Sequence, residues 1–288
     1  MKVAQLTDGT SIRCLLSTEA NVLDHHVSGY FSHGISLSRG AVVFDVGANI
    51  GVFGLRTLQR VTGARVFAFE PIPAIYACLE ANAREMNAQY EDAEVESPGP
   101  FHVYRAGISD RPGELSFTYY PNSPALSTSK PEQWDERELR DAVDGSISHP
   151  PPHLRVTRLI PRPIRRLIAW WFAKRMRRGA LEVTAPLMTV SDVIEAEALR
   201  EINLLKVDCE GGELECLLGV KEGHWSMIQQ AVIEVHDQDG ALRRLCERLS
   251  LMGLTEQVIE QEEALRSTSL YNVFARRVQR SEKEVQHE

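Results

Sequence analysis

Val43-Phe44-Asp45-Val46-Gly47-Ala48-Asn49-Ile50-Gly51 is the stretch that decides the fold. Its first residues belong to an apolar run from Ala41 that ends at an acidic residue and a valine, as in a strand buried on both faces of a parallel sheet. The run breaks at Gly47, and apolar residues then recur at near-helical spacing over residues 52–61. Gly47 and Gly51 would permit a tight strand-to-helix turn, and they would also let a ligand reach the backbone and the free N–H groups of the helix.

Strands and helices alternate on both sides of this stretch. Residues 65–70 form a second apolar run, followed by a helical pattern over 74–87 and a third strand over 101–106. The alternation resumes at Thr189 with these segments: helix 191–198, strand 203–208, helix 213–219, strand 231–235, helix 241–252 and two closing strands near 253–260 and 269–275. This spacing predicts right-handed βαβ units and therefore an α/β, doubly wound parallel sheet.

One α/β domain with additions accounts for the 288 residues. Residues 1–40 are interpreted as an N-terminal extension or lid, with a hairpin over 3–16 and a helix over 22–30. The cofactor-binding catalytic domain is assigned to 41–119 and 186–278. Residues 120–185 interrupt the alternation and are predicted to form a substrate or partner cap. Residues 279–288 are expected to be a flexible tail.

The composition indicates a globular protein, with 43% hydrophobic and 25% charged residues. The net charge of −8 disfavours nucleic acid as a partner, because phosphate backbones are recognised through cationic surfaces. The five cysteines are scattered without a Cys-x-x-Cys pair, which gives no metal knuckle. We find neither a signal-peptide pattern nor about 18 uninterrupted apolar residues, so a cytoplasmic protein without a membrane span is expected.

The charge is unevenly distributed. Residues 145–181 hold nine basic and no acidic residues, and the rest of the chain holds 23 basic against 40 acidic residues, a net charge of −17. Apolar residues recur in the same segment at helical spacing: Ile160, Ile164, Leu167, Ile168, Trp171, Phe172 and Met176. Such a helix can lie on an anionic membrane, or it can bury its apolar face on its own protein and present its charge to an acidic partner. A cap helix with solvated arginines is the third interpretation.

The strand-turn-helix could hold either a dinucleotide or S-adenosylmethionine. The turn lacks the Gly-x-Gly start of the dinucleotide fingerprint. Asp45 would repel a pyrophosphate but attract the amino group of a methionine moiety. Glu70 lies nineteen residues after Gly51, at the end of the second strand, where it can accept hydrogen bonds from both ribose hydroxyls. This combination favours S-adenosylmethionine as the cofactor.

Four segments together resemble the FkbM family of S-adenosylmethionine-dependent methyltransferases. They are residues 44–51, 69–71, 205–213 and 232–236, and the resemblance extends from about 31 to 252. It implies a Rossmann-like class I methyltransferase sheet, with Gly212 standing where the family commonly carries Ala. The residues expected to bind the cofactor are Asp45, Gly47, Ala48, Asn49, Gly51, Glu70, Pro71, Gly107 and Asp208.

Catalytic groups are expected beyond the carboxyl ends of the central strands. His236 is predicted to be the general base, because imidazole titrates near neutrality, with Asp208 or Glu234 orienting it. Alternatively, Asp208, Glu234 and His236 hold a divalent ion such as Mg, Mn or Fe, which would acidify the acceptor hydroxyl. A purely structural interpretation makes Asp208 a helix cap and His236 a hydrogen-bonded surface residue.

Four residues are predicted to contact the substrate: Tyr30, Tyr120, Asn122 and Glu210. Residues 119–124 form a loop that could cover the acceptor. His25, His26 and His33 precede the first strand of the sheet, where they could close over the site as a lid or be solvated.

Residues 119–122 and 186–192 are further similar to family members that serve polyketide or non-ribosomal peptide assembly, where O-methylation is the usual activity. The resemblance therefore implies an O-methyltransferase for a hydroxyl of such an intermediate, tethered to a carrier protein. Acyl- and peptidyl-carrier proteins are strongly acidic, which makes one of them the favoured partner of the basic segment 155–178. The alternatives are a methyltransferase of a free small molecule or sugar, and an NAD-type nucleotide-binding module with a partner-docking helix.

Overall fold

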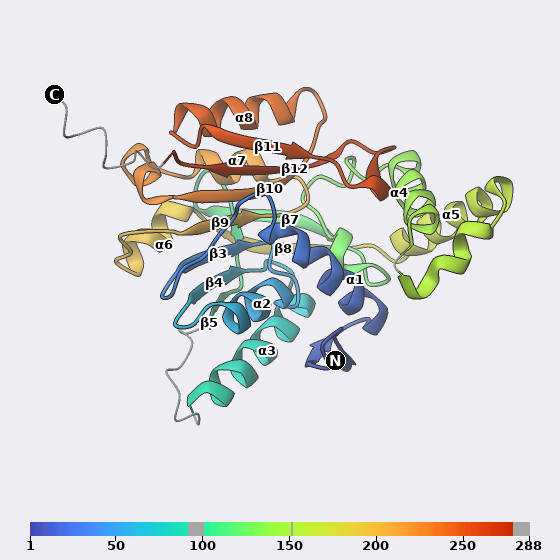
Figure 1. Cartoon of the computed structure of the whole chain (residues 1–288), viewed down its shortest axis with the longest axis horizontal. Coiled ribbons are helices and arrows are strands. Elements are labelled where there is room, and N and C mark those ends of the chain that lie inside the picture. The colour runs from blue at the N-terminus through green and yellow to red at the C-terminus, as the bar shows by residue number, and fades with distance from the viewer. Residues whose placement is uncertain (92–100, 151, 279–288) are drawn as a thin grey trace.

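A seven-stranded sheet forms the centre of the computed structural model, which describes residues 1–91, 101–150 and 152–278 (Figure 1). From one edge to the other its strands are Glu256–Glu260 (β11), Leu270–Arg276 (β12), Gln230–His236 (β10), Leu204–Val207 (β9), Val42–Val46 (β3), Arg65–Phe69 (β4) and Phe101–Tyr104 (β5). β10, β9, β3, β4 and β5 are parallel, and β12 runs antiparallel to both of its neighbours. The predicted doubly wound, Rossmann-like sheet is confirmed. The expected flexible tail, 279–288, lies outside the described residues.

Helices cover both faces of this sheet. Ser17–Val27 (α1), Val52–Arg60 (α2) and Pro73–Glu91 (α3) pack on one face, and Val190–Ala196 (α6), Glu213–Leu218 (α7) and Ala241–Leu251 (α8) pack on the other. Neighbouring residues of β3 show why its sequence is continuously apolar. Val43 belongs to the first core and Phe44 to the second, and both are fully buried. A central parallel strand needs apolar residues at every position because both of its faces are covered.

An N-terminal unit lies against the first face. Lys2–Gln5 (β1) and Ser11–Cys14 (β2) form a hairpin, α1 begins five residues earlier than the predicted residue 22, and a 3-10 turn follows at Ser28–Phe31. Asp24 of α1 is buried and accepts hydrogen bonds from the backbone N–H and hydroxyl of Thr7. It also forms an ion pair with Arg56 of α2, at 2.7 Å. These contacts attach α1 to both the hairpin and the sheet domain.

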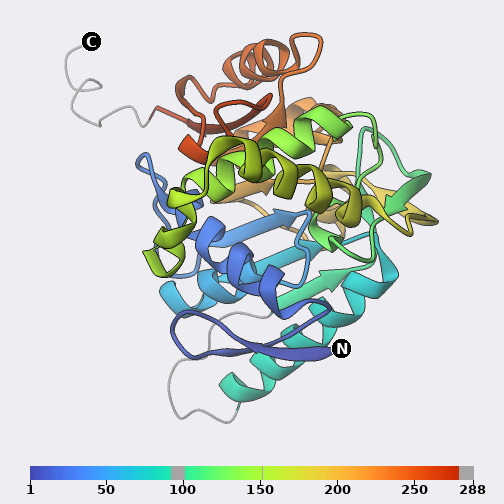
Figure 2. The ribbon, with the colours of Figure 1, turned by 90° about the vertical axis from the view of Figure 1, so that its right-hand side faces the viewer.

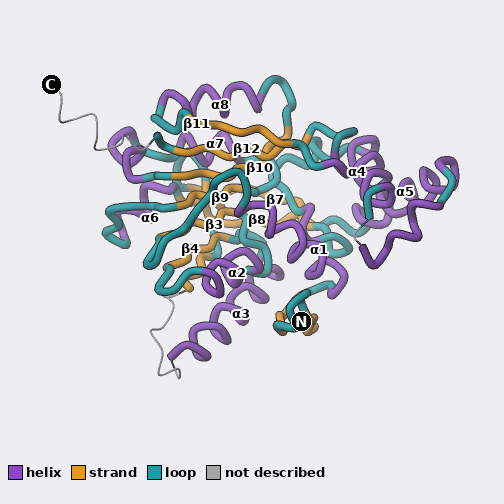
Figure 3. Tube along the Cα trace, in the orientation of Figure 1, coloured by secondary structure: helices purple, strands orange, loops and turns teal. Residues whose placement is uncertain are grey.

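The insertion begins and ends in a three-stranded sheet. Its strands are Gly107–Ile108 (β6), Leu181–Met188 (β8) and Gly113–Tyr119 (β7), with β8 in the middle. Because β8 begins inside the predicted cap range 120–185, the helical part of the insertion ends before Leu181. That part contains the helices Glu136–Ser148 (α4) and Arg162–Arg177 (α5) and the 3-10 turns Pro124–Leu126 and Pro152–Leu159. α4 and α5 lie at one end of the molecule (Figure 3).

A small core holds this cap together. Its buried residues are Tyr120, Leu126, Trp134, Leu139, Ala142, Ala173 and Leu270. The predicted amphipathic helix is present as α5, but it buries Ala169 and Ala173, while Ile164, Leu167, Trp171 and Phe172 are exposed. Four residues of the apolar stripe seen in the sequence therefore face outward, while Ile168 and Met176 are half-buried. No helix in the described part of the chain has the length and apolar character needed to cross a bilayer.

We predict that Asp24→Ala lowers the free energy of unfolding by about 3 kcal/mol, because it leaves the largely buried Arg56 guanidinium without its buried partner. The matched control is Asp8→Ala, which removes a half-exposed carboxylate from the same guanidinium and should cost less than about 1 kcal/mol. Urea denaturation midpoints measure both changes. Equal shifts for the two variants would contradict the assigned role of Asp24.

Candidate active site

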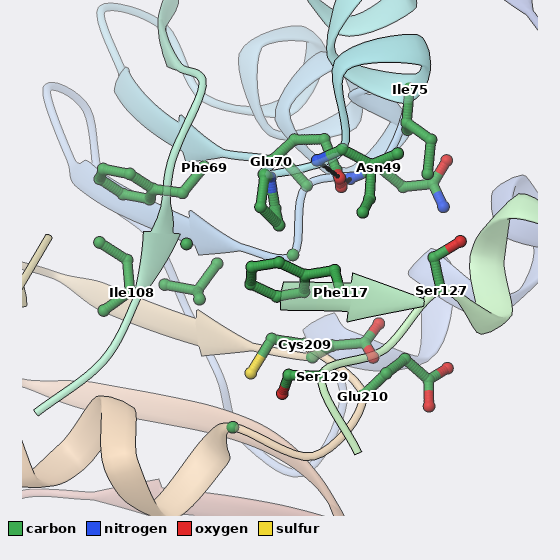
Figure 4. A pocket seen from close by; sticks show the side chains of 18 of the residues that line it. Asn49, Phe69, Glu70, Ile75, Ile108, Phe117, Ser127, Ser129, Cys209 and Glu210 are labelled. Carbon is green, nitrogen blue, oxygen red and sulfur yellow. Dashed lines mark hydrogen bonds between the residues drawn. The ribbon is translucent and has the colours of Figure 1, made fainter. Parts of the chain in front are cut away.

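A cavity of about 510 Å³ opens at the carboxyl ends of β3, β4, β9 and β10. Its volume is in the range of small-molecule and cofactor sites. Figure 4 shows Glu70 and Asn49 on one side of this pocket and Cys209, Ser129 and Glu210 on the other. The β6–β8 sheet and the cap complete the wall, chiefly through Gly107, Ile108, Phe117, Ser127, Ser129 and Lys130.

The turn after β3 packs closely against the backbone at the end of β9. Gly47 has φ +71°, and a Cβ there would lie 1.7 Å from the carbonyl oxygen of Asp208. Only glycine therefore lets the ends of β3 and β9 approach in this way. Gly47, Ala48 and Asn49 line the cavity as predicted, whereas Gly51, with φ +91°, does not reach it and serves as the left-handed residue before α2.

The turn itself offers no row of free donors to a phosphate. The N–H groups of Gly47 and Ala48 both donate to the carbonyl of Phe69. The next two donate to Glu70 and to the side-chain oxygen of Asn49. A dinucleotide-binding turn must aim such groups at a pyrophosphate. This geometry argues against the dinucleotide alternative.

Glu70 is placed as the sequence predicts. It follows β4, lines the cavity, and accepts hydrogen bonds from the backbone N–H groups of Asn49 and Ile72, at 3.2 and 2.8 Å. Burial raises the pKa of Glu70 to about 7, against the opposing effect of these two hydrogen bonds. Pro71 and Gly107 line the cavity beside it. A carboxylate fixed in this way can accept hydrogen bonds from vicinal ribose hydroxyls.

Asp45 does not contact the cavity, which corrects the prediction that it binds the cofactor's amino group. Its side chain is fully buried beneath the turn and forms an ion pair with Lys206 of β9, at 2.9 Å. Lys206 also donates to the carbonyl of Gly47 at 2.9 Å and lies 3.7 Å from Asp208. Burial lowers the pKa of Lys206, but the attraction of Asp45 and Asp208 outweighs it, so the pKa is raised. The feature of the sequence that could have revealed this ion pair is Lys206 itself, a lysine within the otherwise apolar strand β9.

A polar cluster lies on the cavity wall between the sheet and α1. His26 Nε2 lies 2.9 Å from the Tyr30 hydroxyl and 3.1 Å from Glu234, and Tyr30 donates to Asp208 at 2.9 Å. His26 Nδ1 forms a further ion pair with Glu262, at 2.9 Å. Burial lowers the pKa of His26, but its two carboxylate partners raise it well above its usual value. This shift of the pKa favours the imidazolium form of His26, in which both ring nitrogens are donors.

The structure separates His236 from this cluster, against the prediction. His236 is buried outside the cavity lining, with Nε2 3.3 Å from Glu210 and its ring edge-on to Trp134. In the described part of the chain, the three residues whose ligand atoms lie within 4.8 Å of one another are His26, Asp208 and Glu234. His26 thus occupies the place assigned to His236 in the candidate metal set. Of the three N-terminal histidines considered for a lid, His26 is the one that lines the cavity.

Two of the four residues predicted to contact the substrate line the cavity, and two do not. Tyr30 and Glu210 line the cavity. Tyr120 is instead buried in the core of the cap, and Asn122 donates to the carbonyl of Arg178 at 2.7 Å, so neither can contact a ligand there. Asp208 also lines the cavity and makes no cap to the next helix, which begins after Gly212.

The amino-acid sequence of this chain is similar to those of known proteins. The model of the FkbM methyltransferase domain matches residues 45–253. The chain belongs to this family. It is 32% identical over 280 residues to the 31-O-demethyl-FK506 methyltransferase FkbM of Streptomyces tacrolimicus, covering 96% of this chain and 97% of that one. It is 34% identical over 251 residues to the AMB antimetabolite synthetase AmbE of Pseudomonas aeruginosa, covering 85% of this chain and 11% of that protein. The solved methyltransferase FkbM of Methylobacillus flagellatus aligns at TM-score 0.48 and 13% identity, over 90% of this chain and 52% of that one.

Membership of the FkbM methyltransferases implies S-adenosylmethionine as the methyl donor and sets the NAD-type alternative aside. The cavity fits this cofactor chemically. Glu70 can offer paired acceptors to a ribose, and the carboxylates of Asp208 and Glu210 suit its cationic sulfonium and amino groups. Trp134 is a residue that the sequence did not single out. Its indole N–H donates to Glu210 at 2.6 Å and thereby positions a carboxylate of the cavity wall.

Proposed function

We propose that this FkbM methyltransferase transfers a methyl group to a hydroxyl oxygen of a polyketide or peptide natural-product intermediate. The observation that carries the proposal is the pair of carboxylates, Asp208 and Glu234, that meet on the cavity wall at the ends of adjacent strands. A hydroxyl acceptor must lose a proton during the transfer, and a fixed carboxylate is a group that can take it.

The relatives support the choice of acceptor. The Streptomyces relative is named for an O-demethyl substrate, and the two chains are similar along almost their full lengths. The second relative is a much longer synthetase in which the similar region is one part. A free small molecule or a sugar is the alternative to a carrier-tethered acceptor. α1 and residues 124–130 both contribute to the cavity lining, so we place the acceptor beside them.

The chain's residues have separate tasks in this mechanism. S-adenosylmethionine, held beside Glu70 and the turn after β3, would supply an electrophilic methyl group for the acceptor oxygen. Asp208 accepts a hydrogen bond from Tyr30, lies 3.7 Å from Lys206 and orients the acceptor hydroxyl through a further hydrogen bond. Glu234 receives the hydroxyl proton. Burial raises its pKa to about 7, which suits a general base working near neutrality, and His26 fixes its orientation.

The side chains of this cluster also bear on whether a metal ion takes part in the reaction. His26, Asp208 and Glu234 could reach one divalent ion, and their imidazole and oxygen donors would suit Mg, Mn or Fe. However, each carboxylate already has a cationic neighbour, Lys206 for Asp208 and the His26 imidazolium for Glu234. A divalent ion would have to displace the proton of His26 and approach Lys206. We therefore propose that proton transfer to Glu234 replaces metal activation.

The chemistry of the product tests the proposed function. We expect that incubation with ¹³C-methyl S-adenosylmethionine and a metabolite extract from a strain lacking the enzyme labels a product with a methoxy carbon shift. NMR separates this signal from N-methyl and C-methyl signals. Labelling only on nitrogen or carbon would overturn O-methylation while leaving the methyltransferase assignment intact.

Glu234→Gln should reduce kcat by about 100-fold or more, because an amide cannot accept the proton. S-adenosylhomocysteine binding, measured by calorimetry, should be nearly unchanged. The matched control is Glu262→Gln, which removes the other carboxylate partner of His26 from a position outside the cavity lining. It should retain most of the turnover. Similar losses in both variants would show that the carboxylates act only by holding His26.

Turnover should be insensitive to EDTA and should not rise on addition of Mg²⁺ or Mn²⁺, because both carboxylates are already neutralised by protein cations. Initial rates in metal-free buffer measure this. Loss of activity in EDTA that a divalent ion restores would refute the metal-free mechanism and assign the ion to His26, Asp208 and Glu234.

A further inference from the structure

Helix α5 carries a ridge of large apolar side chains on its outer surface. Ile164, Leu167 and Trp171 are three and four residues apart and therefore share one face. Their exposed fractions are 53%, 65% and 53%. Trp170 and Phe172 widen the ridge and are also exposed. Figure 2 looks onto the end of the molecule where this helix lies. Contiguous apolar surface of this kind marks an interaction site.

The outward orientation is fixed by how α5 packs. Ala169 and Ala173 are the residues that it buries, and Ala173 packs with Leu139 and Ala142 in the core of the cap. Arg165 forms an ion pair with Asp144 of α4, at 2.6 Å. Small side chains at the contact allow the two helices to lie close together. Turning the ridge inward would place large side chains where only alanines fit, so the ridge stays available to a partner.

Cationic side chains occupy the same face as the ridge. Lys174 and Arg175 follow Trp171 by three and four residues, and Lys174 lies over the ring of Trp170, 4.4 Å from its centre. Among the described residues no carboxylate lies within ion-pair distance of Arg166, Lys174 or Arg175. Segment 145–181 has no acidic residue at all. The partner of this face must therefore accommodate apolar groups and positive charge side by side.

We propose that α5 docks the enzyme on an anionic lipid bilayer, with Ile164, Leu167 and Trp171 entering the headgroup boundary. Helices that lie in this boundary combine Trp, Phe and Leu with flanking Lys and Arg. Long cationic side chains can extend from beside buried apolar groups to lipid phosphates. This function is independent of the methyl transfer proposed above.

Other occupants fit the same observations less well. A symmetric pair of chains that meet through α5 would bring Lys174 and Arg175 of the two copies together, and these cations repel each other. An acidic carrier protein would match the charge, but charge matching alone would leave the ridge exposed to water. The core of protein–protein interfaces is also depleted in lysine, whereas here Lys174 lies on the apolar face itself. The carrier docking expected from the sequence assumed that α5 buries its apolar face, and the structure shows that face outward.

Tryptophan fluorescence can test the proposal with little ambiguity. Of the four tryptophans, Trp134 and Trp225 are buried, so Trp170 and Trp171 are the ones that solvent reaches. We expect the full chain to sediment with vesicles of phosphatidylcholine and phosphatidylglycerol, with a blue shift of emission, and to bind vesicles of phosphatidylcholine alone only weakly. The binding should weaken with added salt, because the lipid charges are screened.

Two sets of variants separate the apolar and the charged contributions. Leu167→Ser with Trp171→Ser should weaken partitioning by about tenfold or more and reduce the blue shift, since two large side chains no longer leave water. Lys174→Gln with Arg175→Gln should weaken binding to the anionic vesicles by about tenfold or more. Leu251→Ser, on the exposed surface of α8, is the matched control and should bind as the unmodified protein does. Circular dichroism and thermal melting verify that each variant is folded.

Three results would overturn the proposal. The first is absence of anion-dependent vesicle binding by the folded full chain. The second is self-association in sedimentation velocity that Leu167→Ser with Trp171→Ser abolishes, which would assign the ridge to a second copy. The third is saturable binding of a purified acidic carrier protein, in the absence of vesicle binding, that Lys174→Gln with Arg175→Gln abolishes. Methyltransferase activity on a soluble acceptor should be the same in all these variants, so failure of docking and failure of catalysis remain distinct.

Discussion

The ion pair between Asp45 and Lys206 is the constraint on which the site depends. The two residues are register partners on the neighbouring central strands β3 and β9, and both side chains are buried. Removal of either partner would leave an uncompensated charge in the core, at a cost of several kcal/mol. Lys206 also holds the carbonyl of Gly47 and approaches Asp208. One buried lysine therefore holds the turn after β3 and also lies beside Asp208 on the cavity wall.

A second set of contacts completes the site from the N-terminal unit. His26 and Tyr30 bring a cation and a hydroxyl donor to carboxylates that belong to β9 and β10. α1 can do this because Asp24 attaches it to Arg56 of the sheet domain. Without α1, Glu234 would lose His26, which opposes the rise in its pKa caused by burial and by the nearby Asp208. The N-terminal extension thus contributes His26 and Tyr30 to the polar cluster on the cavity wall.

The sequence predicted the parts of the site that follow from local rules. The strand ends, the turn at Gly47 and the position of Glu70 follow from strand-helix alternation, which holds over short distances along the chain. The choice between His26 and His236 does not. Glu234 and His236 share a face of β10, but Trp134 of the cap covers His236, and His26 arrives from 208 residues away. The prediction that Tyr120 contacts the substrate was wrong for a related reason. Residue type alone does not distinguish a residue in the core of the cap from one on the cavity wall.

The apolar stripe of α5 is a second feature whose surroundings could not be predicted from the sequence. Helical spacing predicts that Ile164, Leu167 and Trp171 share a face, but it does not say whether that face meets the protein. Two alanines decide this, because Ala169 and Ala173 permit the close contact with α4 that larger residues would prevent. The same cap core that contains Ala173 also contains Trp134, whose indole N–H holds Glu210 at the cavity. A shift of α5 against α4 would therefore change the packing around Trp134. A partner that binds the outer face of α5 thus contacts a helix whose inner face packs in the same core as Trp134, the residue that holds Glu210.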